Sequence, residues 1–188
     1  MADLIGQAIG NYRLVRLLGR GGFADVYLGE HRYLKNYAAL KILRISLSDK
    51  DASRFLSEAQ ILRRLTHPNI VRVLDFSVER GTPVLIMDYA PGGTARQRHP
   101  IGSVLSLSKT VDYVKQVAAA LQYAHNYSLI HRDVKPENFL FDSRQQLLLS
   151  DFGLALLTPS PELLSTQEMA GTLPYTAPEQ LRGRPTCQ

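Results

Sequence analysis

The sequence predicts an α+β fold in two parts, an antiparallel sheet with one helix followed by a mostly helical region. Short apolar runs separated by turns fill residues 12–89, around a single segment with helical spacing. The stretch Ala90 to Gly93 has the composition of a linker. Beyond it, Ser108 to His125 has apolar residues at helical spacing over a long run. We therefore divide the chain into residues 1–90 and 91–188.

Composition limits the classes of protein to which this chain can belong. The 188 residues are 45% hydrophobic, which is enough for one compact domain or two small lobes. The net charge of +5 suits an anionic ligand, but Lys and Arg are scattered, so we expect no nucleic-acid binding. Cys187 is the single cysteine, which rules out an internal disulfide and fits a reducing compartment, so we expect a cytoplasmic location. Because no apolar run approaches roughly 18 residues, we expect no membrane segment. The start, Met1 to Leu4, has no basic residues followed by a long apolar core, so we expect no signal peptide.

Glycines lie at the tip of the first predicted hairpin. Tyr12 to Leu18 has strand character, Gly19 to Phe23 is rich in glycine, and Val26 to Leu28 restores strand character. A dinucleotide-binding fold would instead place its glycines between a strand and a helix. A glycine tip can lay backbone N–H groups over phosphates, since no side chain blocks the approach. Many such hairpins are simply tight turns, so both readings stay open at this point.

A lysine and a glutamate occupy apolar surroundings in the next two elements. Lys41 lies inside a predicted strand, Tyr37 to Ile45, and Glu58 lies on the apolar face of a predicted helix, Asp51 to Thr66. A buried carboxylate is costly unless it is paired, and Lys41 is the natural partner of Glu58. The alternative is two unrelated charges that reach solvent.

The remaining elements follow from the same patterns. Thr94 to Ser106 contains Pro and Gly and is expected to be irregular, and Ser108 is the expected N-cap of the long helix. Four further strands are expected, at Ile70 to Phe76, Pro83 to Tyr89, Phe139 to Phe141 and Gln146 to Leu149. From Leu154 onwards the chain is loop-like.

The stretch His131 to Asn138 is the expected centre of the chemistry. Pro136 opposes a regular helix, so polar side chains there can be aimed at a substrate. Asp133 could accept a proton from a hydroxyl, Lys135 could steady a transferring anion, and Asn138 could bind a hard cation. Asp151, which follows an apolar run directly, suits a metal-binding carboxylate. The alternative for this stretch alone is a charged surface turn.

Taken together, these motifs resemble the protein kinases of the eukaryotic-like (Hanks-type) serine/threonine type, which also occur in bacteria. The resemblance implies a bilobal protein-kinase fold, ATP and Mg²⁺ (or Mn²⁺) as cofactors, and protein substrates with Ser or Thr acceptors. It implies catalytic roles for Asp133 and Lys135 and metal binding by Asn138 and Asp151. The residues that it implies for nucleotide binding are Leu18, Gly19, Gly21, Gly22, Val26, Ala39, Lys41, Glu58, Met87, Asp88, Ala90, Asn138, Leu140 and Asp151. Ala24 departs from the family pattern, which usually has a third glycine there.

The resemblance extends from Tyr12 to about Gly183 and does not cover a whole kinase domain, so we expect a C-terminally truncated one. Without the rest of the C-terminal lobe, an apolar face of the helix Ser108 to His125 is expected to be exposed and to favour self-association. A nucleotide-binding or interaction module without catalysis is therefore the alternative function.

A regulatory site is also expected. Arg132, directly before Asp133, supplies a fixed cation, and the segment from Leu154 to Ala170 supplies hydroxyl side chains. By their position before Gly171, we expect Ser165 and Thr166 to be phosphorylated. A phosphate there could pair with Arg132 and order the segment. The alternative is a solvated polar linker.

Overall fold

The structure is a computed structural model that describes residues 4–22, 24–44, 56, 59–79, 81–152 and 173–182. The chain forms two compact units. The first comprises Met1–Arg64 and Arg72–Tyr89, and the second comprises Leu65–Val71 and Ala90–Gln188.

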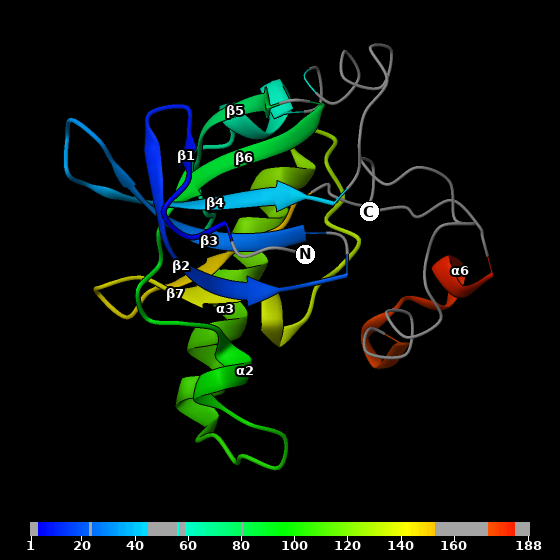
Figure 1. Ribbon diagram of the computed structural model, residues 1–188. Coiled ribbons are helices and arrows are strands. Elements are labelled where there is room, and N and C mark those ends of the chain that lie inside the picture. Colours follow the sequence, from blue (N-terminus) through cyan, green and yellow to red (C-terminus); the bar gives the residue numbers. More distant parts are fainter. Residues whose placement is uncertain are drawn as a thin grey trace. The chain divides into compact units, whose positions relative to one another are not determined.

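The first unit is built on an antiparallel sheet with the order β1-β2-β3-β4-β6-β5 (Figure 1). Its strands are β1 (Ala8–Ile9), β2 (Tyr12–Arg20), β3 (Ala24–His31), β4 (Tyr37–Leu43), β5 (Val73–Glu79) and β6 (Thr82–Asp88). Residues 59–64 are helical, and most of the predicted helix Asp51 to Thr66, including Glu58, lies outside the described residues. β1 was not predicted, because two residues are too few to show an alternating pattern.

Strand register assigns the two faces of this sheet. Tyr27 of β3 lies opposite Leu40 of β4, and Leu40 lies opposite Ile86 of β6. Residues opposite each other on neighbouring strands share a face. These three side chains belong to the core cluster of the unit, together with Leu14, Ala38, Ile42 and Val84. The core therefore lies on one face, and Val26, Ala39, Lys41 and Met87 lie on the other.

The second unit contains helices and one small hairpin. Its elements are α2 (Ala95–Arg98), α3 (Leu107–His125), the 3₁₀ turn η1 (Pro136–Asn138), β7 (Phe139–Phe141), β8 (Leu147–Leu149), the 3₁₀ turn η3 (Leu173–Tyr175) and α6 (Pro178–Leu181). β7 and β8 pair antiparallel. Phe141 and Leu147 are fully buried and form a core cluster with Ala95, against which Tyr113 and Val117 of α3 pack.

Four sequence-based expectations about elements were wrong. The chain from Leu154 onwards was expected to be loop-like, but it contains η3 and α6, because Pro178 is tolerated in the first turn of a helix. The stretch Thr94 to Ser106 contains α2, because Thr94 and Gln97 form a reciprocal capping box that stabilises a short helix despite nearby breakers. The N-cap of α3 is Ser106 rather than Ser108, and its hydroxyl accepts a hydrogen bond from the Lys109 N–H. The strand predicted from Ile70 begins at Val73, because Ile70 instead forms a parallel bridge with Leu149 in the second unit.

Candidate active site

The loop between α3 and β7 has an unusual backbone. Arg132 has φ 66°, and Asp151 beyond β8 has φ 64°. Residues other than glycine rarely adopt this left-handed backbone conformation. Pro136 opens η1, where its missing N–H is tolerated because the first turn needs no donor. Non-glycine residues held in this region cluster at functional sites, where the surroundings stabilise them.

Asp133 is the centre of a polar network in this loop. The Asn138 side-chain amide donates to the Asp133 backbone carbonyl at 2.7 Å and to Asp133 Oδ2 at 2.9 Å. Lys135 Nζ lies 2.8 Å from the same Oδ2. The other carboxylate oxygen, Oδ1, is buried and has no hydrogen-bond partner within the described part of the chain. The network therefore fixes one oxygen of the carboxylate and leaves the other able to accept a proton.

His131 ties this loop to the end of β8. Its buried ring accepts a hydrogen bond from the Asp133 N–H at Nδ1 (3.2 Å), and its Nε2 lies 2.8 Å from the Ser150 carbonyl oxygen. This geometry requires the neutral ring with its proton on Nε2, since a carbonyl oxygen can only accept. Burial lowers the pKa of His131 and outweighs the opposing hydrogen bond to Ser150, so the neutral form is favoured. The ring also packs on Phe152, with 4.6 Å between centroids.

Asn138 and Asp151 are brought to the same end of the small hairpin. Asn138 directly precedes β7, Asp151 follows Ser150 beyond β8, and the two strands are antiparallel. The backbone N–H and the hydroxyl of Ser150 both donate to the Asn138 carbonyl, at 2.9 Å and 3.0 Å. Ser150 and Asn138 are 12 residues apart in the sequence, and their hydrogen bonds hold the side chains of Asn138 and Asp151 at the same end of the hairpin. Among the described residues, no cluster of three or more His, Cys, Asp or Glu side chains could hold a metal.

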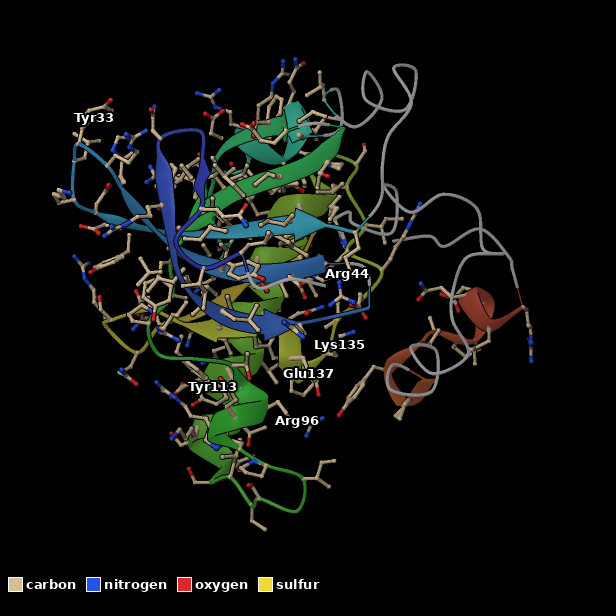
Figure 2. All side chains as sticks on the ribbon, viewed as in Figure 1. Tyr33, Arg44, Arg96, Tyr113, Lys135 and Glu137 are labelled. Atoms are coloured by element: carbon tan, nitrogen blue, oxygen red, sulfur yellow. The ribbon has the colours of Figure 1, made fainter. Side chains whose placement is uncertain are left out.

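The segment 173–182 is attached to the same loop. Gln180 Nε2 donates to the Arg132 carbonyl at 3.1 Å. Arg96 of α2 bonds Glu137 Oε1 at 2.8 Å and the Tyr175 hydroxyl at 2.5 Å. Burial, the largest single effect, raises the pKa of Glu137, but the hydrogen bonds from Arg96 and from the Glu137 backbone together with the charges of Arg96 and Lys135 outweigh it and lower that pKa. Figure 2 labels Arg96 and Glu137 beside Lys135. Sequence reasoning missed this group, and only the place of Glu137 inside the polar loop could have indicated it.

In the first unit, four of the predicted nucleotide residues, Val26, Ala39, Lys41 and Met87, share one face of the sheet. Val26 lies opposite both Gly19 of β2 and Lys41 of β4, while Ala39 lies opposite Met87 of β6. Lys41 is buried, with 8% of its surface exposed. The apolar residues surround a lysine on a face separate from the core cluster. This is the arrangement expected of a surface that takes a flat apolar ring together with an anion.

The glycines of the hairpin are not explained by packing within the chain. A Cβ at Gly19 would meet nothing within 4 Å, and one at Gly21 would meet only Ala24 O at 3.5 Å. Neither glycine has a positive φ. The described residues do not require glycine at these two positions, and the missing side chains leave the backbone open to close approach by a ligand.

The last predicted nucleotide residues of the first unit lie at the end of β6. The Asp88 N–H donates to the Arg72 carbonyl at 3.0 Å, and the Asp88 carboxylate pairs with the Arg72 guanidinium at 3.1 Å. The N–H and the carboxylate of Asp88 are therefore both engaged by Arg72 within the first unit. The predicted site is divided between the units: Leu18, Gly19, Gly21, Gly22, Val26, Ala39, Lys41, Met87 and Asp88 belong to the first, and Ala90, Asp133, Lys135, Asn138, Leu140 and Asp151 belong to the second.

Comparison with known proteins establishes the class. A family model described as "Protein kinase domain" matches residues 12–188, so the chain belongs to the protein kinase domain family. It is 35% identical over 183 residues to the serine/threonine-protein kinase PrkC of Bacillus subtilis, which covers 96% of this chain and 28% of that protein. It is 38% identical over 185 residues to the serine/threonine-protein kinase PknJ of Mycobacterium tuberculosis, covering 95% of this chain and 31% of that protein.

A solved structure agrees with these relatives. The kinase domain of PknI from Mycobacterium tuberculosis superposes with a TM-score of 0.75 at 34% identity, covering 99% of this chain and 71% of that one. The predicted family and fold class are therefore confirmed. The chain spans about a third or less of the length of PrkC and PknJ. The individual site residues stay predictions.

Proposed function

We propose that this chain belongs to a serine/threonine protein kinase that transfers the γ-phosphoryl group of ATP to serine or threonine hydroxyls of proteins. The observation that carries the proposal is the Asp133 carboxylate, with Oδ2 held by Lys135 and Asn138 and Oδ1 without a hydrogen-bond partner in the described chain. The family membership supports the same reaction. Transfer of label from radiolabelled ATP to serine or threonine of a protein, in the presence of magnesium, is the direct test.

In this proposal Asp133 orients the acceptor hydroxyl and takes its proton as the new bond between oxygen and phosphorus forms and ADP leaves. Lys135 contributes positive charge beside the transferring group. Such transfer depends mainly on positioning and charge neutralisation rather than on covalent help from the protein. The hydrogen bond that Asn138 donates to the Asp133 carboxylate, and the one that the Asp133 N–H donates to His131, hold the side chain and the backbone of Asp133 in place for this step.

Asn138 and Asp151 are the proposed holders of magnesium. Their oxygens fit a hard cation that keeps part of its coordination for phosphates and water, so a cluster of three carboxylates is not needed. Both Nδ2 hydrogens of Asn138 have acceptors on Asp133, which leaves Oδ1 as the cation ligand. When bound, the cation neutralises charge that develops on the phosphates.

Magnesium binding gives a thermal-shift prediction. Mg²⁺–ATP is expected to raise the melting temperature of wild type more than that of Asp151→Ala, because ligand stabilises the folded state in proportion to its affinity. Asp112→Ala, which removes an exposed carboxylate on α3, is the matched control and is expected to keep the wild-type shift. Equal shifts in wild type and Asp151→Ala would remove Asp151 from the metal site.

The first unit supplies the proposed nucleotide face. Val26, Ala39 and Met87 would contact adenine, the Asp88 carbonyl and the backbone of Ala90 would bond its edge, and Lys41 would hold the α- and β-phosphates. Leu18, Gly21 and Gly22 would lie along the hairpin over the nucleotide, and Leu140 of the second unit stays a predicted nucleotide residue. The predicted pairing of Lys41 with Glu58 stays a prediction, since Glu58 lies outside the described residues.

Phosphorylation of Ser165 or Thr166 is also proposed, although both lie outside the described residues. The support is Arg132, whose Nε is buried without a hydrogen-bond partner among the residues described. A phosphate could supply that partner with a charge-assisted hydrogen bond. Such an anion would order the segment before residue 173.

We propose a cytoplasmic setting, where ATP is abundant, and protein partners with Ser or Thr acceptors rather than nucleic acid. No helix in the described ranges has the length and apolar character needed to cross a membrane. The setting follows from the ATP requirement and the single cysteine.

The proposed self-association rests on exposed apolar side chains of α3. Leu107 is 80% exposed, Val114 60% and Val111 40%, and all three lie on this one helix. Apolar side chains that gather on one surface favour contact with another apolar surface. Val114→Lys is expected to shift the chain toward monomer by placing a charge on that face, as measured by sedimentation velocity over a concentration series. Lys109→Ala, on the same helix, is the comparison variant, and identical sedimentation of all three proteins would remove the α3 face from any association.

The competing function is a nucleotide-binding module without catalysis. The two are separated by measuring ATP binding and phosphotransfer on the same sample, because only the module would bind ATP without transferring phosphate. The ordered network around Asp133 favours the enzyme, since a module that only binds nucleotide has no use for a fixed carboxylate with an unpaired oxygen.

A further inference from the structure

A charge cluster around one buried carboxylate, that of Asp25, lies beside the turn of the glycine-rich hairpin. Asp25, at the start of β3, is only 5% exposed. Its carboxylate Oδ1 lies 2.5 Å from Arg44 Nη2 and 3.9 Å from Arg20 Nε. Arg44 directly follows β4 and is labelled in Figure 2. Sequence analysis assigned no role to Asp25 or Arg44.

The same arginine also reaches the turn of the hairpin. Arg44 Nη1 lies 3.5 Å from the Gly22 carbonyl oxygen. The turn itself is closed by a hydrogen bond from the Gly21 N–H to Ala24 O at 2.8 Å. One guanidinium therefore connects β4, which carries Lys41, with both the turn and the first part of β3.

The cluster lies on the face of the sheet that does not carry the proposed nucleotide residues. Asp25 lies opposite Ile42, and Ile42 belongs to the core cluster. Val26, the next residue, lies opposite Lys41. Since side chains alternate between faces along a strand, Asp25 points away from the face of Lys41. Arg44 reaches Asp25 there, so it is placed to act on the hairpin and not on the ligand.

Charge makes the pairing necessary. A buried carboxylate without a close partner is strongly unfavourable, and without Arg44 only the more distant and more exposed Arg20 would remain to compensate Asp25. An uncompensated carboxylate under a turn that lies over phosphates would also repel them. The chain can relieve both effects by moving the hairpin so that Asp25 reaches water, which displaces the backbone N–H groups of the turn.

We propose that Arg44 is a positioning residue that holds the glycine-rich hairpin in its phosphate-binding shape, through Asp25 and the Gly22 carbonyl. The inference rests on the proposed binding of ATP in the first unit. It predicts that loss of Arg44 weakens binding of the phosphates of ATP and leaves binding of the nucleoside unchanged, because the hairpin turn lies over the phosphates.

The test compares ATP with adenosine by isothermal titration calorimetry in magnesium buffer. Arg44→Gln is expected to raise the Kd for ATP about tenfold and the Kd for adenosine by less than about twofold. The double variant Asp25→Asn, Arg44→Gln is expected to recover part of the ATP affinity, because it removes the uncompensated carboxylate. Arg44→Lys keeps the charge but not the two-pronged geometry, and is expected to lie between wild type and Arg44→Gln.

Arg13→Gln is the matched control. It removes the ion pair between Arg13 Nη2 and Glu30 Oε2 (3.6 Å) at the opposite end of the same β2–β3 hairpin. Its ATP affinity is expected to equal that of wild type. If Arg44→Gln does not fold by circular dichroism, Arg44→Lys and Arg20→Gln carry the comparison, each with a smaller loss confined to ATP.

Two results would overturn the inference: an unchanged Kd for ATP in the folded Arg44 variants, or equal losses for ATP and adenosine. A wild-type chain that binds neither ligand would instead overturn the proposed nucleotide site, and the inference with it. The two failures are distinguished because the first appears only in the variants and the second already in wild type.

Discussion

Asp133→Asn is expected to reduce the kcat of phosphotransfer by about 10³-fold while leaving the Kd for ATP within about twofold. A positioned proton acceptor typically contributes 10²- to 10⁴-fold, and an amide cannot take the proton. The substitution keeps the size of the side chain, so the hydrogen bond from the Asp133 N–H to His131 is expected to persist. The measurement is steady-state transfer to a serine-containing protein, with ATP binding followed separately.

The control for this prediction is Asp112→Asn, which makes the same chemical change at an exposed position of α3. Its kcat is expected to match wild type. If Asp133→Asn retained phosphotransfer within tenfold of wild type, Asp133 would not be the proton acceptor and the buried Oδ1 would need another explanation. If both Asp133→Asn and wild type bound ATP but transferred nothing, the competing binding-module function would be favoured.

The sequence was informative where chemistry depends on residue type and local spacing. The loop from His131 to Asn138 could be predicted because Pro136 breaks a helix and because acid, amine and amide side chains lie within eight residues. The strand carrying Lys41 could be predicted because its neighbours are apolar, and the structure places Lys41 buried on β4. Patterns of this kind can be predicted because they depend only on residues that are neighbours in the sequence.

Contacts between distant residues could not be predicted in the same way. Arg44 and Asp25 are 19 residues apart, and Arg96 and Glu137 are 41 apart. Each is an ordinary charged residue in sequence, and only strand register or helix placement brings the partners together. The N-cap of α3 failed for a related reason, because Ser106 and Ser108 have the same capping chemistry and the backbone geometry decides between them.

Backbone conformation was the other feature that residue types did not reveal. Arg132 and Asp151 adopt positive φ although neither is glycine. The surrounding bonds explain this: the Arg132 carbonyl accepts from Gln180, and Ser150, next to Asp151, is bonded to His131 and Asn138. Tertiary contacts thus stabilise conformations that local preference disfavours.

Phe141→Ala is expected to lower the free energy of unfolding of the second unit by about 3–5 kcal/mol, the usual cost of removing a buried phenylalanine ring. Phe141 is fully buried between Ala95, Leu147 and Tyr113. Its ring lies 5.4 Å from the Tyr113 ring and 3.9 Å from the Arg98 guanidinium. Its backbone bonds to Gly92 and Gly93, and it is the buried residue of β7, so the substitution removes the side chain that packs this short strand into the core.

The effect should reach the active site through β7. Asn138 directly precedes this strand, so a loosened β7 is expected to lower phosphotransfer along with stability. Because the chain has no tryptophan, urea unfolding is followed by circular dichroism. The control is Ile101→Ala, at a residue 87% exposed, whose free energy of unfolding is expected to stay within about 0.5 kcal/mol of wild type. Phe141→Leu should be intermediate, since it refills part of the cavity. If Phe141→Ala lowered the free energy of unfolding by less than about 1 kcal/mol, the residues around Phe141 would have closed the cavity, and the Phe141 ring would contribute little to holding β7.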